Sequence, residues 1–401
     1  MSNAWGTLTG VKPVKYTREL FEGKFLPPSI KGSTWGSHSE DEVRNILMNN
    51  HEVSREKTDL LIEIYKYQRD RIGKPDKKSI GLYIGIPFCP TRCLYCSFTS
   101  NQKPKEEIER YLKALIKEIE YCGKRMKETG MYPESIYIGG GTPTTLDEIE
   151  LEELLKAISH NIDLCKLKEF TVEAGRPDTI TREKLEVLKN NNISRISINP
   201  QSMKKRTLEL IGRSHTPEEI VDAFKLADSV GLDKVNCDLI AGLPEETPDD
   251  FENTLNKVLS FKPKNITIHT LALKRASRLI EEDDRYHEKE AEIVPVMIDK
   301  ANQTLRANGY KPYYLYRLKR MAGALENVGW QKDDTPSIYN IRIMDEQQSI
   351  LALGAGGISK IYFPDENRLE RVANVSNYEV YIDRLDEMLG RKEEGFFKED
   401  K

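Results

Sequence analysis

The chain has 401 residues, of which 38% are apolar and 31% are charged, and its 61 Lys and Arg against 65 Asp and Glu give a net charge of −4. No run of about 18 apolar residues is present and the first residues are polar, so we expect neither a membrane span nor a secretory signal. A slightly acidic chain is a poor general partner for nucleic acid. The composition favours an ordered cytoplasmic protein of two or three domains.

Residues 1–79 are predicted to form an N-terminal accessory region. Apolar residues at helical spacing predict one or two helices over 40–71, followed by a polar, Pro-bearing linker at 74–79. The abrupt beginning, with a tripeptide at 2–4 that is typical of a cloning remnant, favours a truncated region.

From residue 80, short β-branched or aromatic runs alternate six times with amphipathic stretches. The predicted strands are 81–86, 135–138, 170–173, 195–199, 234–240 and 265–271, and the predicted helices are 104–129, 146–161, 181–191, 204–211, 217–230 and 248–261. Thr181 and Thr216 suit helix starts, and Gly231 suits a helix end. Such alternation predicts an α/β fold of parallel strands with helical crossovers. Six units are too few for a closed eight-fold barrel, so we expect an open, partial (β/α)6 barrel over 80–275.

The alternation stops after residue 275. Residues 283–308 are predicted to form a long helix, despite Pro295, and Tyr-rich and Gly-rich segments and a charged tail follow. Residues 276–401 are therefore predicted to form a smaller C-terminal α+β domain.

The six cysteines fall into two groups of three. Cys122, Cys165 and Cys237 are scattered, and they are predicted to be buried small apolar residues. Cys89, Cys93 and Cys96 form a C-x3-C-x2-C motif directly after the first predicted strand. A tetrahedral zinc site takes four ligands. Three thiolates suit an iron–sulfur cluster instead, in which one iron keeps a free coordination site for a substrate or cofactor.

This motif, after the first strand of a βα barrel, resembles that of the radical S-adenosylmethionine (SAM) superfamily. Segments at later strand ends extend the resemblance across residues 80–273: GGGTP at 139–143, VEA at 172–174, NPQS at 199–202 and NCDLIAGLP at 236–244. Together they resemble the oxygen-independent coproporphyrinogen III oxidase-like family. The segments at 83–89, 97–100, 313–317 and 325–329 are similar to those of its HemZ-type subgroup, the coproporphyrinogen dehydrogenases.

The resemblance implies a 4Fe-4S cluster on Cys89, Cys93 and Cys96, with SAM chelating the fourth iron. An external donor of the flavodoxin or ferredoxin type supplies an electron, and SAM is cleaved to a 5′-deoxyadenosyl radical. The residues that match the family's SAM contacts are Tyr83, Tyr95, Gly140, Gly141, Thr142, Glu173, Gln201, Arg213 and Asp238. By residue type alone, Glu173 also suits a salt bridge and Tyr95 a packed aromatic position.

The leading functional hypothesis is a radical SAM enzyme that acts on a tetrapyrrole. The family implies oxidative decarboxylation of coproporphyrinogen III, in which a propionate becomes a vinyl group, in heme biosynthesis. Propionates need cationic partners, and Arg317, Lys319 and Arg320 are candidates, although a solvated basic turn explains them equally well.

The sequence departs from the family at two positions. Phe98 stands where the decarboxylase has a further Cys, and Glu326 stands where the heme-chaperone relatives have a heme-binding His. Met321 and His269 are candidate substitutes for that histidine as heme ligands, but each is more typical of packing. The alternatives are therefore a heme-delivery protein, a radical SAM porphyrin ring-opening methyltransferase and, more remotely, a tRNA-modifying enzyme.

Overall fold

Six parallel strands form the centre of the fold. The computed structural model describes residues 4–8, 10, 12–23, 36–96, 100–272, 292–318 and 321–398. The strands are β1 (Ser79–Ile86), β2 (Tyr132–Gly140), β3 (Glu169–Glu173), β4 (Arg195–Ser197), β5 (Val235–Ala241) and β6 (Asn265–Thr270). The helices that connect them are α4 (Lys105–Thr129), α5 (Glu148–Asn161), α6 (Arg182–Asn190), α7 (Lys205–Leu210), α8 (Pro217–Ser229) and α9 (Pro248–Ser260). Each neighbouring pair from β1 to β6 is parallel, which confirms the predicted α/β partial barrel.

The predicted helix boundaries have the expected caps. The Thr181 hydroxyl accepts a hydrogen bond from the Lys184 N–H, and Thr216 forms a reciprocal capping box with Glu219 at the start of α8. Gly231 follows α8 with a φ of +76°, a conformation that favours glycine. Local capping chemistry therefore fixes where these crossover helices begin and end.

The residues after 276, predicted as a smaller C-terminal α+β domain, extend the same sheet at both edges rather than forming a sheet of their own. Their strands are β7 (Lys311–Tyr316), β8 (Asn327–Gln331), β9 (Ile350–Leu353), β10 (Ile358–Phe363) and β11 (Arg368–Ala373). The sheet has the order β11-β10-β9-β1-β2-β3-β4-β5-β6-β8-β7. An open barrel leaves unpaired backbone groups at both edges, and these strands satisfy them.

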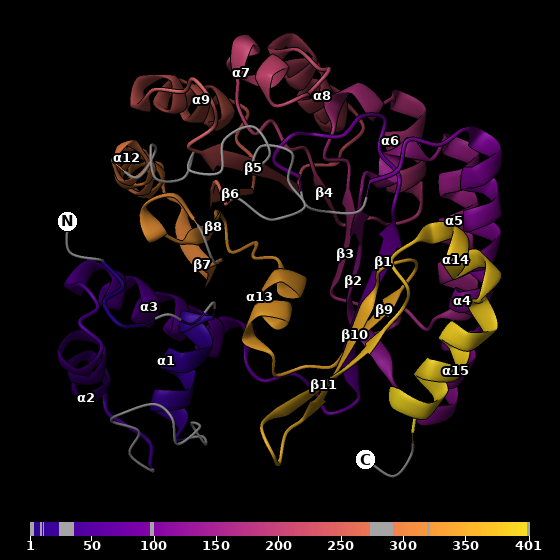
Figure 1. Ribbon diagram of the computed structural model, residues 1–401, viewed down its shortest axis with the longest axis horizontal. Coiled ribbons are helices and arrows are strands. Elements are labelled where there is room, and N and C mark those ends of the chain that lie inside the picture. The colour runs from indigo at the N-terminus through magenta and orange to yellow at the C-terminus, as the bar shows by residue number, and fades with distance from the viewer. Residues whose placement is uncertain are drawn as a thin grey trace.

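Helices cover the outer face of the sheet, and α13 (Ile338–Asp345) lies on its inner side (Figure 1). The described part of the predicted helix at 283–308 is α12 (Ile293–Ala307), with Pro295 in its first turn, where the missing N–H costs little. Residues 283–291 lie outside the described residues. Near the C-terminus, α14 (Tyr378–Asp383) and α15 (Leu385–Gly395) pack on α4. The inner helix is α13 (Ile338–Asp345), which faces the concave side of the barrel.

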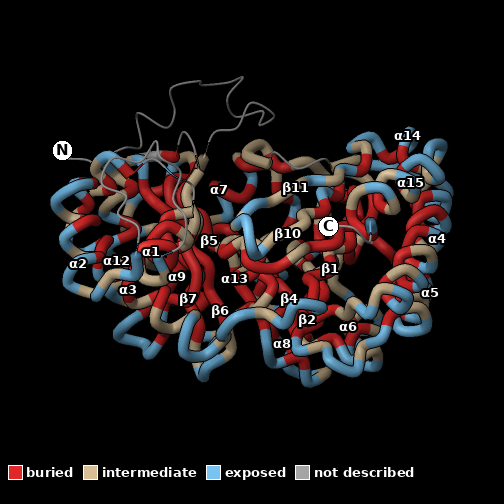
Figure 2. The backbone as a smooth tube through the Cα atoms, turned by 90° about the horizontal axis from the view of Figure 1, so that it is seen from below, coloured by how far each residue is buried: buried red, intermediate tan, exposed pale blue. Residues whose placement is uncertain are grey.

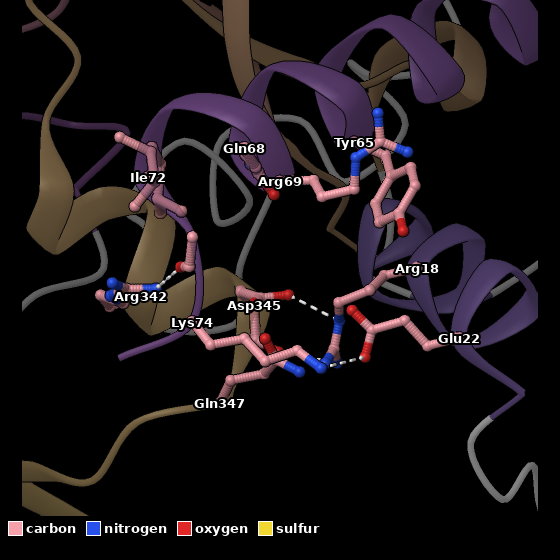
Figure 3. A pocket seen from close by; sticks show the side chains of 12 residues that line it. Arg18, Glu22, Tyr65, Gln68, Arg69, Ile72, Lys74, Arg342, Asp345 and Gln347 are labelled. Atoms are coloured by element: carbon pink, nitrogen blue, oxygen red, sulfur yellow. Dashed lines mark hydrogen bonds and ion pairs between the residues drawn. The ribbon is translucent and has the colours of Figure 1, made fainter. Parts of the chain in front are cut away.

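The N-terminal region contains α1 (Pro13–Glu22), α2 (Glu40–Asn45) and α3 (Arg55–Tyr67). The last two confirm the helices predicted over 40–71, and they are separated where Ser54 caps α3. The region lies against the end of α13. Figure 3 shows Arg18 of α1 pointing at Asp345, with 2.9 Å between Arg18 Nε and the Asp345 carboxylate, beside a small cavity of about 70 Å³.

Buried residues follow the strands, and exposed residues lie mainly on the outer helices and loops (Figure 2). Leu82 and Ile84 of β1 and Ile136 and Ile138 of β2 are fully buried against the crossover helices. Cys122 and Cys237 are buried as predicted, whereas Cys165 is exposed, because it lies in the loop after α5. Within the described residues, no helix has both the length and the apolar character needed to cross a membrane.

Candidate functional site

The cysteine motif lies in a loop at the carboxyl end of β1. Backbone hydrogen bonds hold this loop, with Cys89 N–H donating to the Asn101 carbonyl at 3.1 Å and Asn101 N–H donating to the Pro87 carbonyl at 2.9 Å. Cys89 and Cys93 are buried, and Cys96 is partly exposed. In the described residues no three His, Cys, Asp or Glu side chains are arranged around a single metal ion. A cluster offers a separate iron to each thiolate, so its ligands need not converge on one point.

The glycines at the end of β2 bring its backbone directly against the cysteine loop. Gly141 N–H donates to the Ile86 carbonyl at 2.8 Å, and a Cβ on Gly141 would lie 2.9 Å from Cys89 Sγ and 2.4 Å from the Phe88 carbonyl oxygen. Gly140 has a φ of +114°, which L side chains rarely adopt. Thr142 follows them, with its hydroxyl 3.4 Å from Cys89 Sγ. Gly141 must be glycine because a side chain there would fill the space beside the sulfur, and a Cβ on Gly140 would lie 2.9 Å from the Ile86 carbonyl oxygen.

Glu173 ends β3 and faces the interior of the barrel. Its carboxylate accepts hydrogen bonds from the Tyr137 hydroxyl at 2.5 Å and from the Gly140 N–H at 3.2 Å. Burial raises the pKa of Glu173 to about 7, against the opposing effect of the Tyr137 hydrogen bond. The site therefore contains a carboxyl group that a cationic ligand would convert to its charged form.

Gln201 and Arg213 follow β4 and present unpartnered polar atoms. Among the described residues nothing pairs with the buried Gln201 Oε1 or Arg213 Nε. The other guanidinium nitrogens of Arg213 donate to the Gly175 and Asn199 carbonyls and, at 3.1 Å, to the Tyr95 hydroxyl. A buried polar atom without a partner is costly, so both residues are arranged for a ligand that supplies one.

Asp238, in β5, lies beside a histidine from the next strand. The Asp238 carboxylate is 3.6 Å from His269 Nε2 and accepts a 3.0 Å hydrogen bond from Asn236. The opposite ring nitrogen of His269 is 3.1 Å from the Tyr316 hydroxyl. The pKa of Asp238 is lowered, because the interactions with His269 and Asn236 outweigh its burial.

Tyrosines form one wall of the interior. Tyr83 and Tyr137 occupy paired positions on β1 and β2, with ring centroids 6.4 Å apart, and Tyr339 of α13 stacks on Tyr137 at 4.7 Å. The sequence reasoning included Tyr83 but missed Tyr137 and Tyr339. For Tyr137 a signal was available: it alternates with Ile136 and Ile138 along β2, and this alternation places Tyr137 on the inner face of the strand.

All twelve residues predicted for the site line one cavity of about 680 Å³. They are Cys89, Cys93, Cys96, Tyr83, Tyr95, Gly140, Gly141, Thr142, Glu173, Gln201, Arg213 and Asp238. The cavity continues past them to α13, β9 and β10, where its lining is mostly apolar. It has the size and the mixed lining of a site for organic ligands.

Comparisons with known proteins agree with this geometry. The sequence pattern that defines the Radical SAM superfamily matches residues 83–258. The chain is 36% identical over 399 aligned residues to the oxygen-independent coproporphyrinogen-III oxidase-like protein HemZ of Bacillus subtilis. The alignment covers 98% of this chain and 77% of HemZ. It therefore belongs to this family of radical SAM proteins. The heme chaperone HemW of Bacillus subtilis is 32% identical over 76% of both chains. The structure of coproporphyrinogen III oxidase HemN from Escherichia coli shares the fold, with a TM-score of 0.62 and 21% identity over 81% of this chain and 73% of that one.

The residues present fit the cluster and SAM that membership of the radical SAM superfamily implies. Three thiols supply sulfur ligands, and the Gly140–Gly141 backbone leaves room beside Cys89 Sγ. The unpartnered atoms of Gln201 and Arg213 offer an acceptor and a donor for the polar groups of SAM.

Glu326, which the family resemblance places at the position of a heme-binding histidine, has a structural role in this protein. Glu326 is fully buried and accepts hydrogen bonds from Lys57 at 2.7 Å and from Trp5 Nε1 at 2.9 Å. Met321 is buried, and its sulfur accepts a hydrogen bond from a backbone N–H. Phe98 lies outside the described residues.

Of the three cations predicted to meet propionates, the structure describes Arg317. Arg317 stacks over the Trp5 ring at 4.8 Å and donates to the Leu8 and Ala324 carbonyls, so its guanidinium fastens the N-terminal segment. Lys319 and Arg320 lie outside the described residues. Trp5 and Leu8 are about 300 positions away from Arg317 in the sequence, so no local pattern predicted these two contacts.

Proposed function

We propose that this protein is a radical SAM enzyme that decarboxylates the propionate side chains of coproporphyrinogen III without oxygen. The observation that carries the proposal is the 36% identity to HemZ over 98% of the chain. In this proposal Cys89, Cys93 and Cys96 hold one 4Fe-4S cluster, and SAM occupies the fourth iron. When bound, the two groups supply one-electron cleavage of SAM and abstraction of a hydrogen atom from the substrate.

The chain's own residues position these groups and exclude water. Gly140 and Gly141 let SAM approach the β2 backbone, and Glu173 accepts hydrogen bonds from the ammonium group of SAM. Arg213 and Gln201 pair with its remaining polar groups, while Tyr83, Tyr95, Thr142 and Asp238 complete the contacts. The tyrosine wall removes water from the reacting groups, which protects a radical from side reactions. An external flavodoxin- or ferredoxin-type protein donates the electron.

The proposed decarboxylation determines which kind of substrate the cavity must bind. Transfer of one hydrogen atom to the 5′-deoxyadenosyl radical, loss of carbon dioxide and transfer of one electron to a one-electron acceptor turn a propionate into a vinyl group and leave 5′-deoxyadenosine. The substrate is thus a wide apolar ring system with several carboxylates, and the apolar lining beyond the predicted SAM contacts suits such a ring.

The test is anaerobic reconstitution of the 401-residue chain, followed by addition of SAM and a chemical reductant and measurement of 5′-deoxyadenosine with and without coproporphyrinogen III. We expect this compound to stimulate SAM cleavage and to yield protoporphyrinogen, and we expect Cys93→Ala to abolish both. Deoxyadenosine without any decarboxylated product would contradict the proposed reaction. Mass spectrometry of the products separates decarboxylation from methyl transfer with ring opening.

Heme delivery is the second candidate, because HemW is 32% identical over 76% of both chains. The buried Lys57–Glu326 pair argues against it, since Glu326 is not available as an iron ligand. Titration with heme distinguishes the two functions. A saturable shift of the Soret band that depends on His269 would favour delivery, and its absence would favour the enzyme.

A further inference from the structure

A group of basic residues meets at the end of the cavity that is remote from the cysteines. Lys12 and Lys15 of the N-terminal region both form ion pairs with Glu346, at the end of α13, and Lys360 of β10 lies 3.9 Å from the same carboxylate. Arg371 of β11 occupies the position directly opposite Lys360 in the antiparallel ladder. We call Lys12, Lys15, Lys360 and Arg371 the basic cluster.

The basic cluster has more positive charge than its neighbours neutralise. Within the described residues, the carboxylates at ion-pair distance from its lysines are Glu346 and, 4.0 Å from Lys15, Glu19. Asp345 forms its ion pair with Arg18 (Figure 3), and in the described residues no cluster lysine lies at ion-pair distance from it. Three lysines thus share two carboxylates, one of which, Glu19, also lies 3.9 Å from Arg18.

Lys360 is poorly hydrated for a lysine. Its side chain is 17% exposed, and that of Glu346 is 10% exposed. Burial, reinforced by the charge of Lys12, lowers the pKa of Lys360 to about 8. A further anion would compensate the excess charge of the cluster and stabilise the protonated form of Lys360.

Lys360 belongs to the cavity lining, together with Ile343, Met344 and Ile358. Its position in the sheet is opposite Ile350, which in turn pairs with Gly81 near the start of β1. Ile86, after which the cysteine loop begins, is five positions beyond Gly81, and a strand rises about 3.3 Å per residue. The lysine therefore lies roughly 17 Å along the sheet from the cysteine loop.

We infer that Lys360, supported by Lys12 and Arg371, forms a carboxylate-binding subsite for a substrate that carries several carboxylates on an apolar body. The inference rests on the proposed function, since it assigns residues to one remote propionate of the tetrapyrrole. Apolar side chains around a single ammonium group suit an apolar ring with an anionic arm. The subsite holds this arm while another arm is positioned near SAM.

The first experiment tests the subsite without a tetrapyrrole. Acetylation of lysines in the full chain is followed by mass spectrometry in tricarballylate and in sodium chloride of equal ionic strength. We expect tricarballylate to slow acetylation of Lys360 at least threefold and to leave Lys311, an exposed residue at the start of β7, unchanged. Equal rates at Lys360 in the two salts would overturn the subsite.

The second experiment tests whether a tetrapyrrole uses the subsite. Binding of coproporphyrin III and of its tetramethyl ester is measured for the reconstituted wild type, Lys360→Met, Lys360→Arg and the control Lys311→Met. We expect Lys360→Met to weaken coproporphyrin III binding about tenfold or more, because it removes a charge-assisted hydrogen bond. We expect Lys360→Arg and Lys311→Met to retain binding, and the ester to bind weakly to every variant.

The outcomes separate the subsite from the proposed function. Wild-type affinity of Lys360→Met for coproporphyrin III would overturn the subsite and leave the tetrapyrrole proposal intact. Protection of Lys360 by tricarballylate, together with no binding of coproporphyrin III by the wild type, would support the subsite and contradict the tetrapyrrole as substrate.

Discussion

The Lys57 ammonium group donates a 2.7 Å hydrogen bond to the Glu326 carboxylate, and both side chains are buried. The two residues are 269 positions apart in the sequence. The pair joins α3 of the N-terminal region to the start of β8, and Trp5 adds a second hydrogen bond to the same carboxylate. The N-terminal region is therefore fastened to the edge of the barrel by a charged contact inside the protein.

Removal of one partner should destabilise the fold strongly. We expect Lys57→Met to lower the free energy of unfolding by about 3–5 kcal/mol, because Glu326 stays buried without its cation. Urea unfolding followed by circular dichroism measures the effect. The control is Lys225→Met, which breaks the exposed pair with Asp222 and should change stability by less than about 1 kcal/mol. Equal losses in the two variants would show that the Lys57–Glu326 pair has no special role.

The raised pKa of Glu173 predicts a pH-dependent stability of the protein without cofactors. Between about pH 4.5 and pH 7 the folded state holds a proton that the unfolded state has released, so the free energy of unfolding falls as the pH rises. Glu246 has its pKa raised to about 7 in the same way, because it is also buried. Glu173→Gln should reduce the slope without abolishing it, and Glu245→Gln, at an exposed position, should not change it. Urea midpoints across this pH range measure the slope, and an unchanged slope in Glu173→Gln would be the contrary result.

The close approach of Gly141 to the cysteine loop predicts a specific loss of iron. In Gly141→Ala the new methyl group meets Cys89 Sγ at 2.9 Å and the Phe88 carbonyl at 2.4 Å, so the loop must move. We expect less than half of the wild-type iron after reconstitution, measured by metal analysis and visible absorbance. Gly390→Ala in α15 is the matched control, since its Cβ meets nothing within 4 Å. Wild-type iron content in Gly141→Ala would refute the role assigned to this glycine.

The pKa of Lys360 predicts how carboxylate binding varies with pH. The ammonium group is charged below about pH 8 and loses its proton above it, so the affinity for coproporphyrin III should fall as the pH rises from about 7 to about 9. Carboxylates stay ionised throughout this range. Lys360→Arg keeps its charge and should bind with an affinity that varies much less with pH. Fluorescence titration provides the affinities, and an identical decline in both proteins would assign the dependence to another group.

Local patterns in the sequence predicted the barrel because the signals are short-range. The Gly81–Ile86 portion of β1 shows the β-branched pattern of a buried strand, and Thr216 with Glu219 marks a helix start within four residues. The three cysteines fall within eight consecutive residues. Each of these features can be recognised before any contact between distant elements is known.

The remaining features depend on contacts between segments that are far apart in the chain. Neither the pairing of β9 with β1 nor that of β8 with β6 has a local signature, so the C-terminal segments could not be placed on the two sheet edges in advance. The contact of Arg317 with the Trp5 ring likewise has no local signature, because the two residues are remote in sequence.

The sequence by itself therefore determined the βα alternation and the sulfur motif, since periodicity and spacing are local properties of the chain. Only the tertiary structure decided that one cavity connects the cysteine loop with Lys360, and that the carboxylate of Glu326 pairs with Lys57. The physical reason is that burial and electrostatic interaction depend on distance in space, which a one-dimensional pattern does not contain.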